Sequence, residues 1–341
     1  MNNKTILIRC DASHEVGFGH MMRCLALAEE LRGNQGCKVV FAMRSAEIGF
    51  QEVREHGYAV MTPGAAENFN YHQWMKGIIQ ETKADAVVLD VRDDLPSDVL
   101  KDLRSGRILI VTIDDPSDRR LDADLAFYPP VPQLREMNWD GFKGVLYAGW
   151  EWVILRKEFT KTSKRIKNKR PVILVTMGGS DPEGLTLKAV AALDMVQQNF
   201  DAIVILGKGF QHHEELHELL LKTKQCFRIQ NDVQNMAEIM AGSDLAVISF
   251  GTTAYELSAM GVPAIYLCLT GDHSQSASIF VNKGIALNMG VHDSVSKMEL
   301  ANTISRYLSD EHRRIKMAEQ FKKIPKMDGA RRIAALISER I

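Results

Sequence analysis

Short apolar runs alternate with amphipathic stretches along the chain. In the first half the apolar runs lie at Thr5–Arg9, Val39–Met43, Ala86–Asp90 and Ile108–Asp114, and each is typical of a buried strand. The stretches between them, such as Met21–Leu31, have the apolar spacing of a helix. Strands that alternate with helices predict a parallel sheet with helices on its faces.

The same alternation begins again in the second half. Further strands are predicted at Val172–Met177, Ala202–Leu206, Leu245–Ser249 and Ala264–Leu267, and Lys297–Ile341 has a helical pattern throughout. A chain of 341 residues also exceeds the usual size of one hydrophobic core. We therefore predict two doubly wound α/β domains, residues 1–160 and 172–341. The basic segment 161–171 between them is interpreted as a solvated linker.

Composition excludes several classes of protein. Hydrophobic residues make up 45% and the formal net charge is −1, as in ordinary soluble enzymes, and Lys and Arg are scattered outside the linker, so we expect no nucleic-acid partner. The apolar run near the N-terminus is followed at once by Arg9 and Asp11, unlike a secretory signal. No apolar stretch reaches the roughly 18 residues needed to span a bilayer. We expect a cytoplasmic protein without a membrane partner.

Cysteine usage bears on metal binding. The five cysteines are an odd number and show no Cys-x-x-Cys spacing, which argues against a disulfide framework or a structural zinc site. We expect buried reduced thiols, no metal and no other cofactor.

Ligands of open α/β sheets bind beyond the carboxyl ends of the strands. Polar or glycine-rich loops that follow predicted strands are therefore the candidate binding segments, and we expect them to face one interdomain cleft. They are Arg9–His20, Asp90–Asp94, Asp114–Pro116, Met177–Gly184, Phe250–Thr253 and Thr270–Gln275.

The first loop contains the candidate base. Gly17 and Gly19 let the backbone approach a ligand closely, but Met22 stands where a dinucleotide fingerprint needs a third glycine. His20 follows at the start of the predicted helix, where the helix dipole favours the neutral imidazole that a general base requires. A histidine that merely caps the helix is the alternative.

The fourth loop is a candidate anion site. Backbone N–H groups at Gly178 and Gly179, with the hydroxyl of Ser180, can bind phosphate between a strand and a helix. The Gly-Lys-Ser/Thr of a P-loop is missing, so a diphosphate held without magnesium fits better than a triphosphate. An ordinary turn between strand and helix is the alternative.

The last two loops supply further hydrogen-bonding groups. After Gly251, the hydroxyls of Thr252 and Thr253 can cap the next helix and reach phosphate. Glu256, about one turn later, can accept two hydrogen bonds from a ribose diol, although it could equally be a surface residue. Gln275 is placed to bind sugar hydroxyls.

Together these segments resemble the PseG family of UDP-sugar hydrolases, and they are similar to spore-coat polysaccharide proteins of the SpsG type. The resemblance covers nearly the whole chain and rests on an ordered set of short motifs. They are Arg9-x-Asp11, Gly17-Phe18-Gly19-His20, Arg23, Ile113-Asp114-Asp115, Leu155-Arg156-x-Glu158-Phe159, Met177-Gly178-Gly179-Ser180-Asp181, Tyr255-Glu256, Gly261-x-Pro263 and Gln275.

The resemblance implies a GT-B fold, in which two Rossmann-like domains face a cleft. It also implies hydrolysis of UDP-2,4-diacetamido-2,4,6-trideoxy-β-L-altropyranose to UDP and a free sugar, for synthesis of pseudaminic acid or a surface or spore-coat polysaccharide. The N-terminal domain would hold the sugar and the C-terminal domain UDP. His20 would deprotonate the water that attacks the anomeric carbon with inversion.

The resemblance implies further roles near the sugar. Asp11, Asp114 and Asp115 would orient the histidine or the sugar amides, and Arg9 would contribute to substrate binding. The chain departs from the family pattern in three places. Val91-Arg92 stands where the family often has a His-Tyr pair, and Gly184 stands where it often has Asn. The family also often has Asn near the end of the strand that here runs into Tyr128-Pro129-Pro130.

Two other functions stay open. A GT-B glycosyltransferase would use the same donor-binding loops but pass the sugar to an acceptor, and one fold often hosts both chemistries. A nucleotide-sugar sensor would bind without turnover, and the presence of His20 argues against it.

Overall fold

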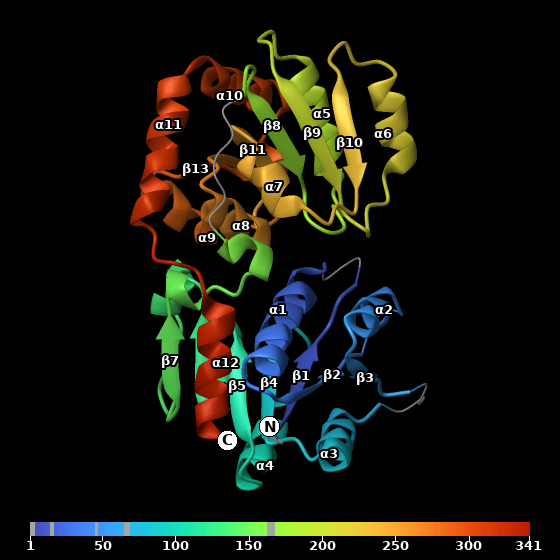
Figure 1. The fold of residues 1–341 in the computed structure, drawn as a ribbon, viewed down its shortest axis with the longest axis vertical. Coiled ribbons are helices and arrows are strands. Elements are labelled where there is room, and N and C mark those ends of the chain that lie inside the picture. The colour runs from blue at the N-terminus through green and yellow to red at the C-terminus, as the bar shows by residue number, and fades with distance from the viewer. Residues whose placement is uncertain (1–3, 14–16, 45–46, 65–68, 162–167) are drawn as a thin grey trace. The chain divides into compact units, whose positions relative to one another are not determined.

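The computed structural model describes residues 4–13, 17–44, 47–64, 69–161 and 168–341. These residues form two compact units, each of which contains one sheet of parallel strands with helices on its faces (Figure 1). Unit 1 comprises Met1–Arg156 with Met327–Ile341, and unit 2 comprises Lys157–Lys326. The two predicted doubly wound sheets are confirmed.

Unit 1 has a seven-stranded sheet in the order β3-β2-β1-β4-β5-β6-β7. Its strands are β1 (Thr5–Cys10), β2 (Lys38–Ala42), β3 (Ala59–Met61), β4 (Ala86–Asp90), β5 (Leu109–Ile113), β6 (Leu125–Tyr128) and β7 (Val145–Ala148). Its α-helices are α1 (Gly19–Gly33), α2 (Glu47–Glu55), α3 (Tyr71–Thr82), α4 (Ser97–Ser105) and α12 (Gly329–Arg340). Short 3₁₀ helices lie at η1 (Asp118–Asp122), η2 (Pro132–Arg135) and η3 (Trp150–Trp152).

Two apolar cores lie on the two faces of this sheet. Side chains of a strand alternate between faces, so Ile6 and Ile8 of β1 pack in the core formed with α1 and α12. Leu7 points the other way, into the core formed with α3 and α4. This double coverage explains why the central strands are continuous apolar runs.

The last helix corrects the predicted domain boundary. Residues 172–341 were expected to form one domain, but α12 lies beside α1 of unit 1 (Figure 1). The reason is its apolar face, because Ile333, Ala334 and Ile337 are fully buried in the core that contains α1. The helical pattern predicted over 297–341 is also broken, since residues 324–328 are not helical.

Unit 2 has a six-stranded sheet in the order β10-β9-β8-β11-β12-β13. Its strands are β8 (Val172–Thr176), β9 (Asp201–Leu206), β10 (Phe227–Asn231), β11 (Leu245–Ser249), β12 (Ala264–Cys268) and β13 (Ala286–Val291). Its α-helices are α5 (Leu185–Asp194), α6 (His213–Leu220), α7 (Met236–Ala241), α8 (Thr252–Met260), α9 (Gly271–Asn282), α10 (Lys297–Ser309) and α11 (Glu311–Gln320). Short 3₁₀ helices lie at η4 (Lys157–Thr160), η5 (His292–Ser294) and η6 (Phe321–Lys323).

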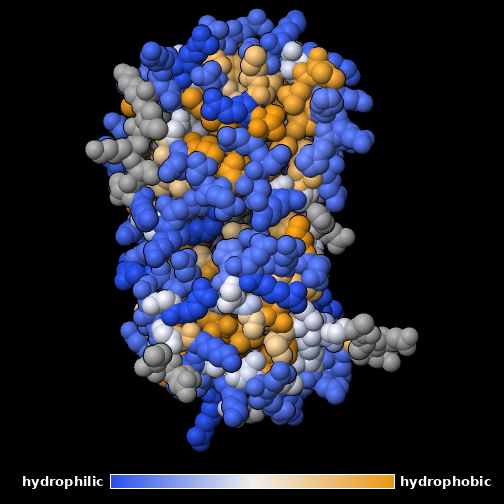
Figure 2. All heavy atoms as spheres, turned by 45° about the vertical axis from the view of Figure 1, so that its right-hand side comes forward, coloured by the Kyte–Doolittle hydropathy of each residue, from blue (hydrophilic) through white to orange (hydrophobic). Residues whose placement is uncertain are grey.

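The surface of each unit is mainly polar on the face drawn in Figure 2, where several apolar areas interrupt it. Within the described residues, no helix has both the length and the apolar character needed to cross a membrane.

Candidate functional site

The strand order places one pair of loops at the centre of unit 1. The strands β2 and β3 follow on one side of β1, and β5, β6 and β7 follow on the other side of β4. The strands β1 and β4 are parallel neighbours. Cys10, the last residue of β1, pairs with Asp90, the last residue of β4. A crevice at such a switch point is where doubly wound sheets bind ligands.

His20 and Asp90 meet at this point. The imidazole Nδ1 lies 2.6 Å from Oδ1 of Asp90, and the carboxylate is almost fully buried whereas the His20 side chain is 19% exposed. Nη2 of Arg23 also lies 3.1 Å from this nitrogen, but the contact with Asp90 is the shorter of the two. An ionised carboxylate only accepts hydrogen bonds, so Asp90 favours the tautomer with the proton on Nδ1. That tautomer leaves the lone pair on Nε2, as a base requires.

Helix α1 presents three groups to the same carboxylate. His20 lies in its first turn, and Arg23 and Cys24 follow on the same face three and four residues later. Arg23 donates from Nε to Oδ2 and from Nη2 to Oδ1 of Asp90, both at 2.5 Å. The thiol of Cys24 donates to Oδ2 at 3.4 Å. Asp90 is therefore held from one side by a single helix.

These contacts keep Asp90 ionised. Burial alone would raise its pKa, but the charges and hydrogen bonds of Arg23 and His20 outweigh that effect and hold the pKa well below its usual range. Burial would likewise lower the pKa of Arg23, yet Asp90 and Asp114 raise it above its usual value. Arg23 and Asp90 therefore form an ion pair on the Nδ1 side of the His20 imidazole.

Asp114 continues the network at the end of β5. Its Oδ2 accepts from Nη1 of Arg23 at 3.3 Å and from Nη2 of Arg92 at 2.9 Å. Its backbone has a positive φ of 54°, which is unusual for a residue other than glycine and typical of functional sites. The predicted catalytic residues His20 and Asp114 are thus brought together through Arg23.

Asp11 lies in a neighbouring network. Its Oδ2 accepts from Nη2 of Arg9 at 2.5 Å, and its Oδ1 accepts from the backbone N–H of Arg44 at 2.7 Å. These bonds join the residues that follow β1 and β2.

Arg9 and Asp115, which were expected to bind substrate, have hydrogen-bond partners within unit 1. Arg9 is 0% exposed, and its guanidinium is bonded within the unit, including to Tyr71 and Asp93 at 2.7 Å each. Asp115 is equally buried and accepts from Ser117 and Arg119. Buried charges need such partners, so both residues hold loops in place.

The two glycines of the first loop are placed as follows. Gly17 has a positive φ of 78°, and its N–H donates to the carbonyl of Ser13 at 2.8 Å. Gly19 is the first residue of α1. Residues 14–16 of this predicted loop lie outside the described residues.

Unit 2 has its own switch point, between β8 and β11. The turn Gly178–Ser180 follows β8, and Gly178 takes a positive φ of 84°. Asp181 caps α5, since its carboxylate accepts from the N–H groups of Leu185 and Thr186 at 2.8 and 2.9 Å. The carboxylate of Asp181 is therefore directed to the start of α5.

The loops after β11 and β12 lie next along the same edge. Gly251 precedes α8, and Thr252 and Thr253 form the first turn, where helix N–H groups have no intrahelical acceptor. Glu256 is buried in the second turn, with 8% exposed. Gln275 is exposed on α9. Because β8, β11 and β12 are adjacent and parallel, these residues lie at one end of one sheet.

The three departures have local roles. The hydroxyl of Tyr128 donates to the carbonyl of Asp115 at 2.5 Å, Arg92 contacts Asp114, and Gly184 takes a left-handed conformation before α5. All three support loops of the two switch points.

The sequence analysis named Asp90 only as the first residue of a candidate loop and Arg23 only as part of a family motif, and it gave neither residue a role in the site. Asp90 ends an apolar strand at the carboxyl edge, and Arg23 follows His20 at helical spacing. Both signals were available in the sequence.

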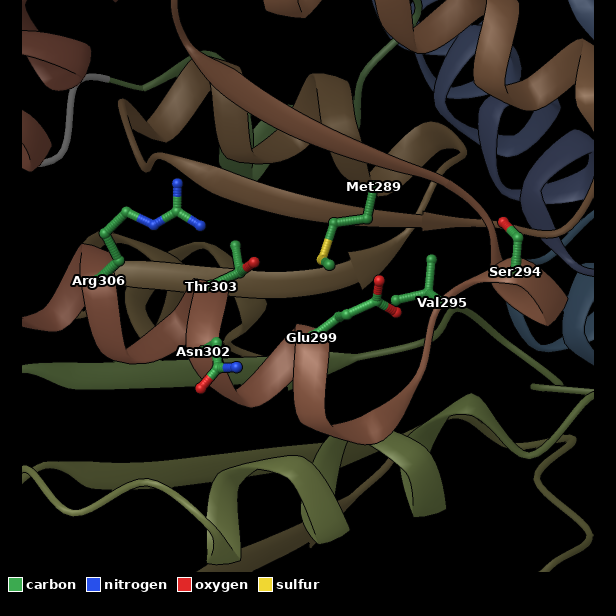
Figure 3. A pocket seen from close by; sticks show the side chains of 7 residues that line it. All are labelled: Met289, Ser294, Val295, Glu299, Asn302, Thr303 and Arg306. Atoms are coloured by element: carbon green, nitrogen blue, oxygen red, sulfur yellow. The ribbon is translucent and has the colours of Figure 1, made fainter.

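One cavity among the described residues is lined by none of the predicted site residues. A cavity of about 380 Å³ lies in unit 2 between β13 and α10. Figure 3 shows Met289 of β13 and Glu299 and Thr303 of α10 directed into it. Within the described residues, no group of three or more His, Cys, Asp and Glu side chains is placed to hold a metal ion.

Comparisons with known proteins found one family model and several curated proteins that are similar to this chain in sequence. Residues 172–333 match the glycosyltransferase family 28 C-terminal domain. The chain is 32% identical over 273 residues to an uncharacterized protein of Methanocaldococcus jannaschii, which covers 77% of this chain but only 55% of that protein. The chain thus spans about half the length of this relative.

Two further relatives are matched over nearly their whole length. The spore coat polysaccharide biosynthesis protein SpsG of Bacillus subtilis is 25% identical over 338 residues, 97% of each chain. The UDP-2,4-diacetamido-2,4,6-trideoxy-beta-L-altropyranose hydrolase of Campylobacter jejuni is 23% identical over 287 residues, 82% of this chain and 97% of that one.

Solved structures confirm the predicted GT-B fold. MurG of Acinetobacter baumannii superposes with a TM-score of 0.75 at 16% identity, over 98% of this chain and 99% of that one. The spinosyn rhamnosyltransferase SpnG complexed with thymidine diphosphate gives a TM-score of 0.66 at 14% identity, over 98% and 99%.

Proposed function

We propose that this chain is a UDP-sugar hydrolase of surface or spore-coat polysaccharide synthesis, with His20 as the general base. The observation that carries the proposal is the contact of His20 with the buried, ionised Asp90, which directs the Nε2 lone pair away from the carboxylate. The similarity to the hydrolase of C. jejuni and to SpsG supports the class of substrate.

The reaction follows from these groups. His20 Nε2 takes a proton from water while the water oxygen attacks the anomeric carbon, and the bond from that carbon to the β-phosphate oxygen breaks. UDP leaves with the electron pair, and the configuration inverts. Asp90 stabilises the imidazolium that forms, and general-base contributions of this kind are typically 10²–10⁴-fold.

Unit 2 holds UDP in this proposal. The N–H groups of the turn Gly178–Ser180 and the first turn of α8 bind the diphosphate, since helix N-termini favour anions. Glu256 binds the ribose and Gln275 the sugar. The expected substrate is a UDP-linked diacetamido-trideoxyhexose of the pseudaminic acid type.

The test is UDP release in the absence of any acceptor. The purified protein is incubated with UDP-2,4-diacetamido-2,4,6-trideoxy-β-L-altropyranose and with UDP-N-acetylglucosamine in ¹⁸O-water. Hydrolysis gives free sugar with ¹⁸O on the anomeric carbon and the inverted anomer as first product. No release from either substrate, with or without acceptors, contradicts an enzymatic function.

A glycosyltransferase is the second candidate, because residues 172–333 match a glycosyltransferase family. The His20–Asp90 pair would then deprotonate an acceptor hydroxyl in place of water. UDP release that depends on an added acceptor would establish this alternative. Tight binding of the UDP-sugar without turnover would indicate a sensor.

A further inference from the structure

The nucleotide site proposed in unit 2 would receive a negatively charged diphosphate. The groups proposed to bind the diphosphate, Gly178–Ser180 and Gly251–Thr253, are all neutral donors. A sugar-linked diphosphate carries about two negative charges, and the leaving UDP gains another when the glycosidic bond breaks. Catalysis benefits most from a cation that meets charge as it develops.

The loops that follow the strands of unit 2 contain one such cation. They run between each strand and the next helix, at 177–184, 207–212, 232–235, 250–251, 269–270 and 292–296. Lys208 is the only Lys or Arg in these described loops. It follows β9, which is the parallel neighbour of β8.

The loop of Lys208 is fixed directly on the glycine turn. The N–H of Gly209 donates to the carbonyl of Gly179 at 2.9 Å. On the other side of Lys208, a Cβ added to Gly207 would lie 2.4 Å from that carbonyl and 2.6 Å from the Cα of Gly179. Two glycines that touch the turn therefore flank the lysine and bring its backbone against the anion site.

We infer that Lys208 binds the diphosphate of the nucleotide. The inference rests on the proposed function, in which unit 2 holds UDP. The Lys208 side chain is 34% exposed and its Nζ lies 3.5 Å from Oδ2 of Asp232, whose side chain is 46% exposed. An ion pair as open to water as this contributes little, so a diphosphate can take the place of Asp232 as the partner of Lys208 at small cost.

The experiment is calorimetric titration of Lys208→Met with UDP and with uridine. We expect about 10-fold or greater loss of UDP affinity, typical of a lost charge-assisted hydrogen bond, and unchanged uridine affinity. Lys208→Arg should restore most of the UDP affinity. Lys222→Met, an exposed lysine after α6, is the matched control and should bind both ligands like the wild type.

The possible results distinguish failure of the inference about Lys208 from failure of the proposed function. A wild-type protein that binds neither UDP nor uridine overturns the proposed function and the inference together. A wild-type protein that binds UDP, with Lys208→Met binding it equally well, overturns the inference alone. Equal losses of UDP and uridine affinity in Lys208→Met also overturn it. Uridine has no phosphate, so loss of a phosphate contact cannot weaken its binding.

Discussion

Nδ1 of His20 lies 2.6 Å from Oδ1 of Asp90, although the two residues are 70 positions apart in the sequence. The contact exists because α1 is the first helix after β1 and β4 runs beside β1. A histidine with a buried carboxylate behind it is oriented and is stabilised when it accepts a proton.

His20→Asn should lower turnover by a factor of roughly 10² or more, because asparagine cannot accept the proton. UDP affinity should change little, since His20 belongs to unit 1. Initial rates of UDP release and calorimetric titration of UDP measure the two effects. His56→Asn, an exposed histidine of unit 1, is the control, and near wild-type turnover of His20→Asn would remove it from the mechanism.

Asp90→Asn should destabilise the protein by about 3–5 kcal/mol, because Arg23 would keep a largely buried charge without its main counter-ion. Denaturant unfolding measures the free energy of unfolding. The control is Asp140→Asn, an exposed carboxylate of unit 1, which should be nearly neutral. A free energy of unfolding equal to that of the wild type would show that Arg23 does not depend on Asp90.

Acid should destabilise the protein in part through Asp90. The pKa of Asp90 is lowered in the folded state, so its contribution is complete above the unfolded pKa of about 3.9. That contribution is lost progressively as the pH falls below that value toward the folded pKa. Unfolding free energies measured between pH 6 and 3 should show a smaller decrease for Asp90→Asn than for the wild type. Parallel curves would contradict the prediction.

Glu256→Ala should weaken binding of UDP and of the UDP-sugar alike, since its proposed partner is the ribose that both share. Loss of hydrogen bonds to a charged group costs about 1.5–3 kcal/mol, or roughly 10- to 150-fold in affinity. Titration of both ligands measures this, with Glu218→Ala on the exposed face of α6 as control. Unchanged UDP affinity would show that the ribose is held elsewhere.

Gly207→Ala should distort the anion site without touching any side chain proposed to bind the nucleotide. Its new methyl group would meet the backbone of Gly179, which cannot move aside as a flexible side chain can. Overpacking of this kind costs about 1–3 kcal/mol. Thermal unfolding and UDP titration measure the two effects. Gly77→Ala, where the added methyl meets nothing within 4 Å, should be neutral or slightly stabilising.

The central strands could be predicted because they are covered on both faces. The apolar runs of β1, β4, β8 and β11 follow from that burial and were found from the sequence. Edge strands lack this signal. In β7, Val145, Leu146 and Ala148 are exposed, and most of β10 is polar or half-buried, so neither has a continuous apolar run.

Site residues could be proposed from the sequence where the residue type itself indicates a chemical role. His20 and the turn at Gly178 fall into this class, and their roles stay predictions. The sequence does not show whether Arg9 and Asp115 contact a ligand or the neighbouring loops, and their substrate-binding roles also stay predictions. Only the partners of Arg9, such as Tyr71 and Asp93, reveal that it stabilises loops.

The position of α12 affects how the protein is made. Its residues are translated after those of unit 2, yet they complete the core that begins with β1 and α1. During synthesis the part of this core that α12 covers therefore stays exposed until all of unit 2 has left the ribosome. A nascent chain that stops before residue 327 would lack Ile333, Ala334 and Ile337, and the apolar surface that they cover in this core is the kind that chaperones bind and proteases attack.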